Sequence, residues 1–110
     1  DCFKVKMVIT PRVPWINSID FVVGTPDTLV FNTDGLGSQE LVELNGMATV
    51  GDWFLVEGTA SNDGYFQVAS GGGSGEWGLY NGTGALNDAV GETGITDFKI
   101  TIIGSTSTGA

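Results

Sequence analysis

Two runs of strand-forming residues, 53–57 and 65–69, lie on either side of a polar segment of the chain. The even-numbered positions of both runs are apolar: Phe54, Val56, Phe66 and Val68. Because successive side chains of a β-strand point to opposite faces, each run can cover a core on one side. The segment between them, residues 61–64, consists of Ser, Asn, Asp and Gly, which are typical turn residues. The pattern therefore predicts a β-hairpin.

Further runs with strand character occur along the chain, most of them bounded by Gly, Pro, Asn or Asp. They cover residues 3–9, 19–23, 28–31, 40–44, 77–80 and 97–103. In the first of these runs, alternation predicts one shared face for Phe3, Val5, Met7 and Ile9. In the last run it predicts a shared face for Phe98, Ile100 and Ile102. Residues 85–94 are expected to be irregular, with a single helical turn over 86–90.

Eight short strands separated by turns predict an all-β fold, a small antiparallel sandwich or barrel. The 18 glycines favour this fold, because each glycine inside a helix costs about 1 kcal/mol. The first and last strands, residues 3–9 and 97–103, are expected to pair, since both are long and carry Lys on the outward face.

A length of 110 residues is typical of a single domain, here residues 1–110. We expect this domain to carry an N-terminal arm over residues 1–12 and a short C-terminal tail over residues 104–110. The arm, the connector around Trp15 and the tail are the candidate contact elements.

Acidic residues outnumber basic residues by 13 to 4, which gives a formal net charge of −9. Lys4, Lys6 and Arg12 lie within the first twelve positions, and Lys99 is the remaining basic residue. An acidic surface repels phosphate groups, so no nucleic acid and no membrane is predicted as a partner. Acidity also keeps a β-rich protein soluble, which is the preferred explanation. The alternative is that the basic N-terminal arm docks on an acidic neighbouring copy.

The chain contains no histidine and a single cysteine, Cys2. Ser–His and Cys–His nucleophile pairs and the usual zinc sites are therefore excluded. Asp52, Glu57 and Glu40 lie near apolar strands, and two carboxylates can act as acid and base on a sugar. With 13 acids in the chain, chance proximity and a solvated outer face explain these three as well. The sequence predicts no catalytic residue and no enzymatic activity.

Calcium is the metal whose ligand preferences deserve consideration, because it binds carboxylate and carbonyl oxygens. Residues 62–64 and 32–35 resemble fragments of calcium-binding loops. Neither segment has the regular acidic spacing followed by a distant Glu, and turns explain both better. The sequence therefore predicts no metal and no cofactor.

Five aromatic side chains could form a platform for a sugar ring: Trp15, Trp53, Trp77, Tyr65 and Tyr80. Aromatic residues also fill the cores and subunit interfaces of small β-domains. A role in the core or at an interface is the preferred interpretation.

Residues 51–70 follow the pattern GD-x-F-x-V-x-G-T-x-S-N-D-G-x-F-x-V-A-S. This pattern resembles a β-rich module of tailed-bacteriophage virion proteins, GD-x-[IF]-x-V-x-G-[ST]-x-x-N-D-G-x-[FY]-x-V. Residues 86–95 and 98–100 are similar to a closing segment of that module, L-x-x-E-x-A-G-x-x-[VI]-x-I. The resemblance covers roughly residues 40–103 and departs from the module in the glycine-rich residues 71–75 and at Thr96-Asp97.

The resemblance implies a non-enzymatic structural protein of the virion, in head decoration, neck or tail. It implies assembly with copies of itself and with other virion structural proteins, and it transfers no catalytic residue. One alternative is an extracellular filament or surface-layer subunit that exchanges a terminal strand with its neighbour. A second alternative is a carbohydrate-binding module that uses the tryptophans.

Overall fold

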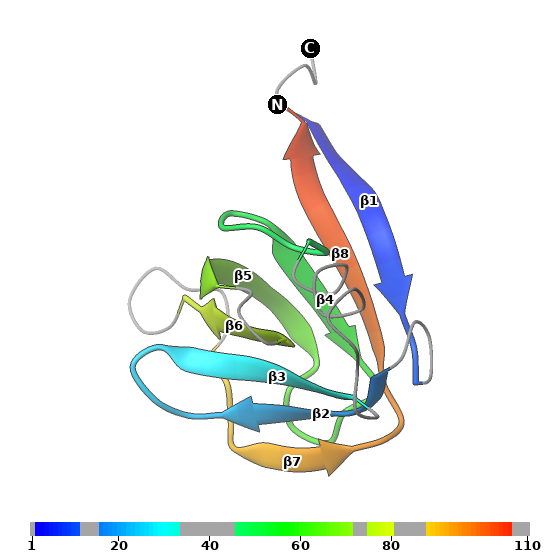
Figure 1. The fold of residues 1–110 in the computed structure, drawn as a ribbon, viewed down its shortest axis with the longest axis vertical. Coiled ribbons are helices and arrows are strands. Elements are labelled where there is room, and N and C mark those ends of the chain that lie inside the picture. The colour runs from blue at the N-terminus through cyan, green and yellow to red at the C-terminus, as the bar shows by residue number, and fades with distance from the viewer. Residues whose placement is uncertain (1, 12–15, 34–45, 72–74, 81–87, 107–110) are drawn as a thin grey trace.

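Eight antiparallel strands form one sheet in the computed structural model, which describes residues 2–11, 16–33, 46–71, 75–80 and 88–106 (Figure 1). The strands are β1 (Cys2–Ile9), β2 (Ile16–Val22), β3 (Asp27–Thr33), β4 (Trp53–Glu57), β5 (Gly64–Gly71), β6 (Glu76–Leu79), β7 (Glu92–Ile95) and β8 (Lys99–Thr106). Their order in the sheet is β1-β8-β4-β5-β6-β3-β2-β7. The all-β fold of about eight short antiparallel strands is therefore confirmed.

The sheet bends at β5 and encloses its own core. The first half of β5 pairs with β4 and its second half pairs with β6, so the two parts of the sheet face each other (Figure 1). Aromatic rings meet between these parts: the centroids of Phe31 and Phe54 are 6.1 Å apart, and those of Phe21 and Phe66 are 5.4 Å apart. Burial of these apolar side chains is the main force that holds the bent sheet together.

The hairpin predicted from alternation is present as β4 and β5. Phe54 lies directly opposite Phe66, and Leu55 opposite Tyr65. The four apolar side chains at even-numbered positions are buried: Phe54, Val56, Phe66 and Val68. The predicted pairing of the first and last strands is also confirmed, because β1 pairs with β8 from Cys2–Thr106 to Ile9–Ile100.

The predicted arm and tail both overlap paired strands of the sheet. Residues 2–9 of the arm pair with β8, and the side chain of Ile9 is fully buried. Residues 104–106, expected to begin a tail, are the last residues of β8. We therefore expect that deleting residues 1–12 would remove part of the core as well as a contact element.

Other predicted segments fall in different places. The strand expected over 40–44 and the connector at Trp15 lie outside the described residues. Residues 92–94, the last part of the segment expected to be irregular, belong to β7, which pairs with β2. No helix in the described ranges is long and apolar enough to cross a membrane.

Candidate interaction face

Because of a bulge in β1, the first apolar residues of this strand lie on the outer surface of the sheet. Pairing with β8 shifts between Val5 and Met7, so Lys6 is an extra residue in the strand. Beyond the bulge, Ile9 is buried and Met7 packs against the core, whereas Phe3 and Val5 are exposed. The predicted single face of Phe3, Val5, Met7 and Ile9 is therefore wrong, because an inserted residue reverses the alternation.

An ion pair accompanies this bulge. The Lys6 ammonium lies 2.6 Å from Oδ2 of Asp52, which also accepts a hydrogen bond from the Thr49 amide at 2.9 Å. The Lys6 side chain passes over Gly104 of β8 on its way to Asp52. A Cβ atom at Gly104 would stand 2.5 Å from Cδ of Lys6 and 3.2 Å from Oδ1 of Asp52. A side chain at position 104 would therefore displace the lysine from its path to Asp52.

Replacing this glycine tests the crossing. We expect Gly104→Ala to lower the free energy of unfolding by about 1–2 kcal/mol, because the new methyl group displaces Lys6 from Asp52. Gly91→Ala is the matched control, since a Cβ at Gly91 meets nothing within 4 Å. Urea unfolding of both variants measures the difference, and equal stability would contradict the role given to Gly104.

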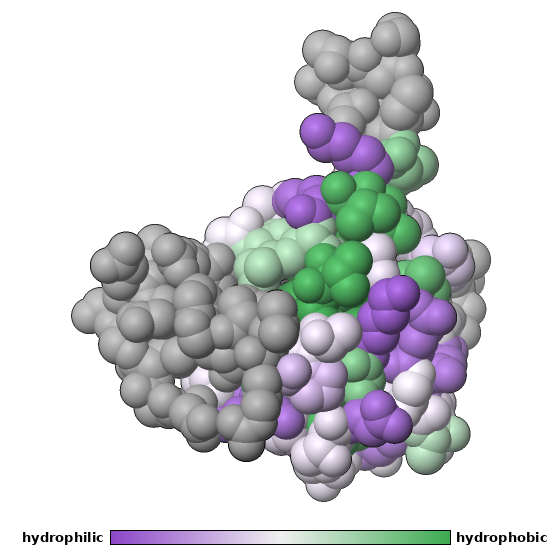
Figure 2. Space-filling model, turned by 90° about the vertical axis from the view of Figure 1, so that its right-hand side faces the viewer, coloured by the Kyte–Doolittle hydropathy of each residue, from purple (hydrophilic) through white to green (hydrophobic). Residues whose placement is uncertain are grey.

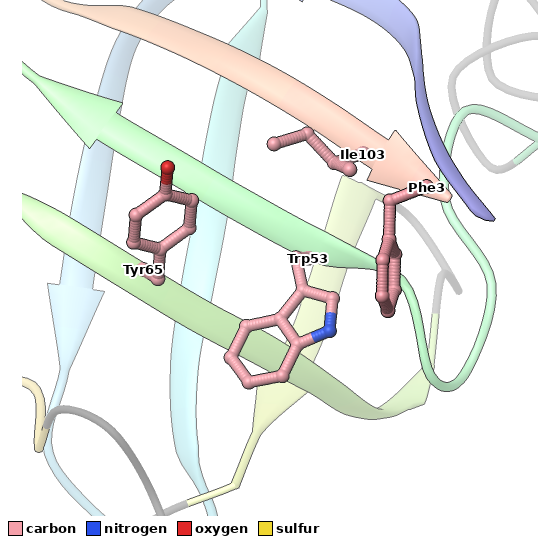
Figure 3. A pocket seen from close by; sticks show the side chains of 4 residues that line it. All are labelled: Phe3, Trp53, Tyr65 and Ile103. Atoms are coloured by element: carbon pink, nitrogen blue, oxygen red, sulfur yellow. The ribbon is translucent and has the colours of Figure 1, made fainter. Parts of the chain in front are cut away.

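An open groove of about 370 Å³ lies on the outer face of the sheet, lined by Phe3, Trp53, Tyr65 and Ile103 (Figure 3). Strand pairing explains how residues distant in sequence meet there. Ile103 of β8 lies opposite Val5 of β1 on one side and opposite Trp53 of β4 on the other. The lining is almost entirely apolar. The groove is therefore suited to apolar side chains of a partner more than to a polar ligand.

The exposed apolar surface extends beyond the groove along β1. Phe3, Val5 and Val8 all have large exposed fractions, at 60%, 56% and 41%. Hydrophobic surface gathers on the side that Figure 2 presents, with hydrophilic residues around it. A contiguous apolar patch with a polar border is characteristic of an interaction surface.

The turn between β4 and β5 is tied to the segment before β7 by Asn62, whose exposed fraction is 1%. Its side-chain amide donates to the Val90 carbonyl oxygen and to Oε1 of Glu92, both at 2.8 Å. The Val90 amide donates back to Oδ1 of Asn62 at 2.8 Å. We call these three hydrogen bonds the Asn62 clasp. Turn composition alone explained Asn62 in the sequence, so the long-range role was missed.

Two nearby carboxylates accept hydrogen bonds from residues of the same turn. Glu92 accepts hydrogen bonds from the Ala60 and Ser61 amides at 3.0 and 3.2 Å. Asp63 accepts from the Thr59 amide and hydroxyl, both at 2.8 Å, and these bonds, the amide bond first, lower the pKa of Asp63. In the part of the chain that the structure describes, no three potential metal ligands come together. These acids therefore act as structural hydrogen-bond acceptors.

The carboxylates considered for sugar chemistry are not brought together. Asp52 is paired with Lys6, and Glu57 lies exposed opposite Lys99 at the other end of β4. Five residues of strand separate these acids by roughly 16 Å, more than the roughly 5–10 Å between catalytic carboxylates of glycosidases. Glu40 lies outside the described residues.

The aromatic residues divide between the core and the surface. Trp77 is fully buried, whereas Trp53 and Tyr65 line the groove. Tyr80 is exposed but is not one of the described residues around the groove. The preference for a core role is thus confirmed for Trp77, and Trp15 lies outside the described residues.

Comparisons with protein families, curated proteins and solved structures found no match to this chain. The groove is the feature of the chain with the clearest physical consequence, because its exposed apolar lining is stabilised when another molecule covers it.

Proposed function

We propose that this chain is a non-enzymatic structural subunit that works by binding neighbouring subunits through the groove of Phe3, Trp53, Tyr65 and Ile103. The observation that carries the proposal is an open apolar groove on a chain with a net charge of −9. Charge of this size keeps the free chain in solution, while the groove supplies a local driving force for contact.

The particle that we propose is the virion of a tailed phage, with other structural proteins and further copies of the chain as partners. The resemblance of residues 51–70 and 86–100 to virion modules supports this proposal. The two segments that carry the resemblance also contact each other at the Asn62 clasp, as two parts of one structural module would. Head decoration, neck and tail are the positions that the resemblance implies.

Carbohydrate binding is the second candidate, favoured by Trp53 and Tyr65 side by side in the groove (Figure 3). Aromatic faces can stack on sugar rings, but sugar hydroxyls also need hydrogen-bond partners. The apolar lining of the groove favours a protein contact over a sugar.

An extracellular filament or surface-layer subunit would use the same groove in another location.

Two tyrosines of similar exposure provide a matched test of the groove. Tyr65, which lines it, has an exposed fraction of 44%, and Tyr80, which does not, has 47%. We expect Tyr65→Ser to weaken self-association or incorporation into particles about tenfold or more, because it removes an aromatic contact. Tyr80→Ser is expected to leave association unchanged. Sedimentation over a range of concentrations and salt measures both.

Three outcomes would contradict the proposal. Equal effects of Tyr65→Ser and Tyr80→Ser on association would show that the groove is not the contact surface. If mass spectrometry did not detect the chain in purified particles of the virus that encodes it, the proposed role in the virion would be wrong. Quenching of Trp fluorescence by a sugar, lost in Tyr65→Ser, would favour the carbohydrate candidate.

A further inference from the structure

The groove lies on a face of the sheet that also carries two opposite charges. The β4–β8 register runs without a shift through three pairs on this face: Trp53–Ile103, Leu55–Thr101 and Glu57–Lys99. Because side chains two residues apart share a face, Glu57 and Lys99 lie on the same side of the sheet as the groove. Both side chains are exposed. A cation on β8 and an acid on β4 thus stand side by side at one end of the face.

The neighbouring strands extend the same face with apolar side chains. Their register adds three pairs: Val5–Ile103 and Val8–Thr101 toward β1, and Leu55–Tyr65 toward β5. Phe3 lies at the end of the face away from the charges, opposite Ser105. We call this surface of β1, β8, β4 and β5 the outer face. Its apolar side chains lie in rows across the strands, and Lys99 and Glu57 form the row at one end.

The outer face is complementary to itself about a two-fold axis that runs along the strands between β8 and β4. Rotation about this axis lays β8 of one copy over β4 of the other, at the same level along the strands. Lys99 of each copy then meets Glu57 of the other copy. The same rotation lays β1 over β5, so that Val8 of one copy meets Tyr65 of the other. The face therefore fits a second copy of itself in both charge and apolar character.

A two-fold axis across the strands gives a poorer match. It would lay the charged end of one copy over the end of the other copy that carries Phe3. Lys99 and Glu57 would then be covered by apolar side chains without a charged partner, which costs free energy. The two charges therefore select the arrangement in which the strands of both copies run in the same direction.

The outer face has the size of a small specific interface. Four strands span roughly 20 Å across the sheet, and β8 from Lys99 to Ser105 spans roughly 20 Å along it. Side chains roughen this flat footprint of about 400 Å², so the accessible area is on the order of 600 Å², as in the smaller specific interfaces. Two such faces pack about 10 Å apart, as the sheets of a sandwich do.

We infer that two copies of this chain pack with their outer faces together, and that Lys99 of each copy pairs with Glu57 of the other. This inference rests on the proposed function and names the partner of the groove, a second copy of the chain. The apolar rows supply the driving force, and the two ion pairs fix the orientation. Because both copies use the same surface, the contact closes at a dimer.

Charge reversal tests the pairing across the contact. We expect Glu57→Lys alone and Lys99→Glu alone each to dimerise about tenfold or more weakly than the wild type at low salt, because like charges then meet twice. An equimolar mixture of the two variants restores dimerisation, since the cations of one variant then face the acids of the other. A chain that carries both substitutions restores it as well, because the two charges have only exchanged places.

Two control variants carry the same changes in net charge away from the outer face. Glu76→Lys alters an exposed acid of β6. Lys4→Glu alters an exposed residue that lies opposite Gly104, on the other side of the sheet from the groove. We expect both controls to dimerise within about twofold of the wild type, since neither touches the contact.

Sedimentation equilibrium over a concentration series measures dimerisation, and circular dichroism establishes that each variant is folded. Should a charge variant fail to fold, Val8→Ser tests the same face without a charge change and is expected to weaken dimerisation. Val22→Ser on β2 is its matched control, since the exposed fractions of Val8 and Val22 are 41% and 47%.

A mixture of the two charge variants that stays monomeric would overturn the inference. Losses in the controls as large as those in the outer-face variants would also overturn it, as would a wild type that is monomeric or that grows without passing through a dimer. If such a wild type still enters particles and Tyr65→Ser weakens its incorporation, the proposed function stands without the inference. A wild type that is monomeric and absent from particles contradicts both.

Discussion

Trp77→Ala is expected to lower the free energy of unfolding by about 3–5 kcal/mol. The side chain is fully buried, and its ring centroid lies 5.2 Å from that of Phe31 and 6.0 Å from that of Phe54. Truncation leaves a cavity between the two parts of the bent sheet. It also removes the donor of the 3.2 Å hydrogen bond from Nε1 to the Ala48 carbonyl oxygen. Because small domains have a total stability of only about 5–15 kcal/mol, much of the fold's stability depends on this residue.

Urea unfolding followed by circular dichroism measures the loss, and two further variants separate its causes. Trp77→Phe keeps most of the ring contacts but leaves the Ala48 carbonyl without its donor, so a loss of about 1–3 kcal/mol is expected. Trp53→Ala removes the same side chain from the outer groove, where it is only half-buried. A loss with Trp53→Ala as large as with Trp77→Ala would contradict the assignment of Trp77 to the core.

The core could be predicted from sequence because burial follows alternation closely in most strands. Phe54 and Val56 share a parity and are both buried, and so are Ile100 and Ile102. These strands keep a regular register across β4 and β8, so the period of two is preserved. Where each residue advances the strand by one step, residues two positions apart share a face and are buried together.

The groove could not be predicted in this way, because it depends on a register shift. The hydrophobic pattern of β1 is as regular as that of β8, yet the bulge at Lys6 exposes Phe3 and Val5. The bulge is linked to Asp52, 46 positions along the chain, and to the space at Gly104. Because this partner is so distant in sequence, the residues around Lys6 do not indicate the bulge. The strand order that brings Phe3, Trp53 and Tyr65 together is equally non-local.

The Asn62 clasp illustrates the same difference between local and long-range information. The segment around Asn62 was correctly predicted to connect two strands, because turn chemistry is local. Its hydrogen bonds to Val90 and Glu92 span 28 and 30 residues. Burial of an Asn side chain is uncommon and requires partners for its polar atoms, but the identity of those partners comes only from the fold.

Asn62→Ala is expected to lower the free energy of unfolding by roughly 2–4 kcal/mol, because it removes a buried side chain and leaves the part-buried Val90 amide and carbonyl groups without these partners. Asn62→Asp keeps the acceptor for the Val90 amide but places a carboxylate where the amide lies 2.8 Å from Oε1 of Glu92. We expect a comparable loss at neutral pH. That loss should shrink in acid, because protonation of the introduced carboxylate removes its repulsion with Glu92.

Asn32→Ala is the matched control, since Asn32 is half-buried and its side-chain amide donates to the Ser18 hydroxyl at 3.1 Å. This bond joins two adjacent strands that already pair through their backbones, so a loss of no more than about 1 kcal/mol is expected. Urea unfolding at neutral and acidic pH compares the three variants. If Asn62→Ala and Asn32→Ala were equally stable, or if Asn62→Asp did not recover with acid, the clasp would not be what fastens the β4–β5 turn to the segment before β7.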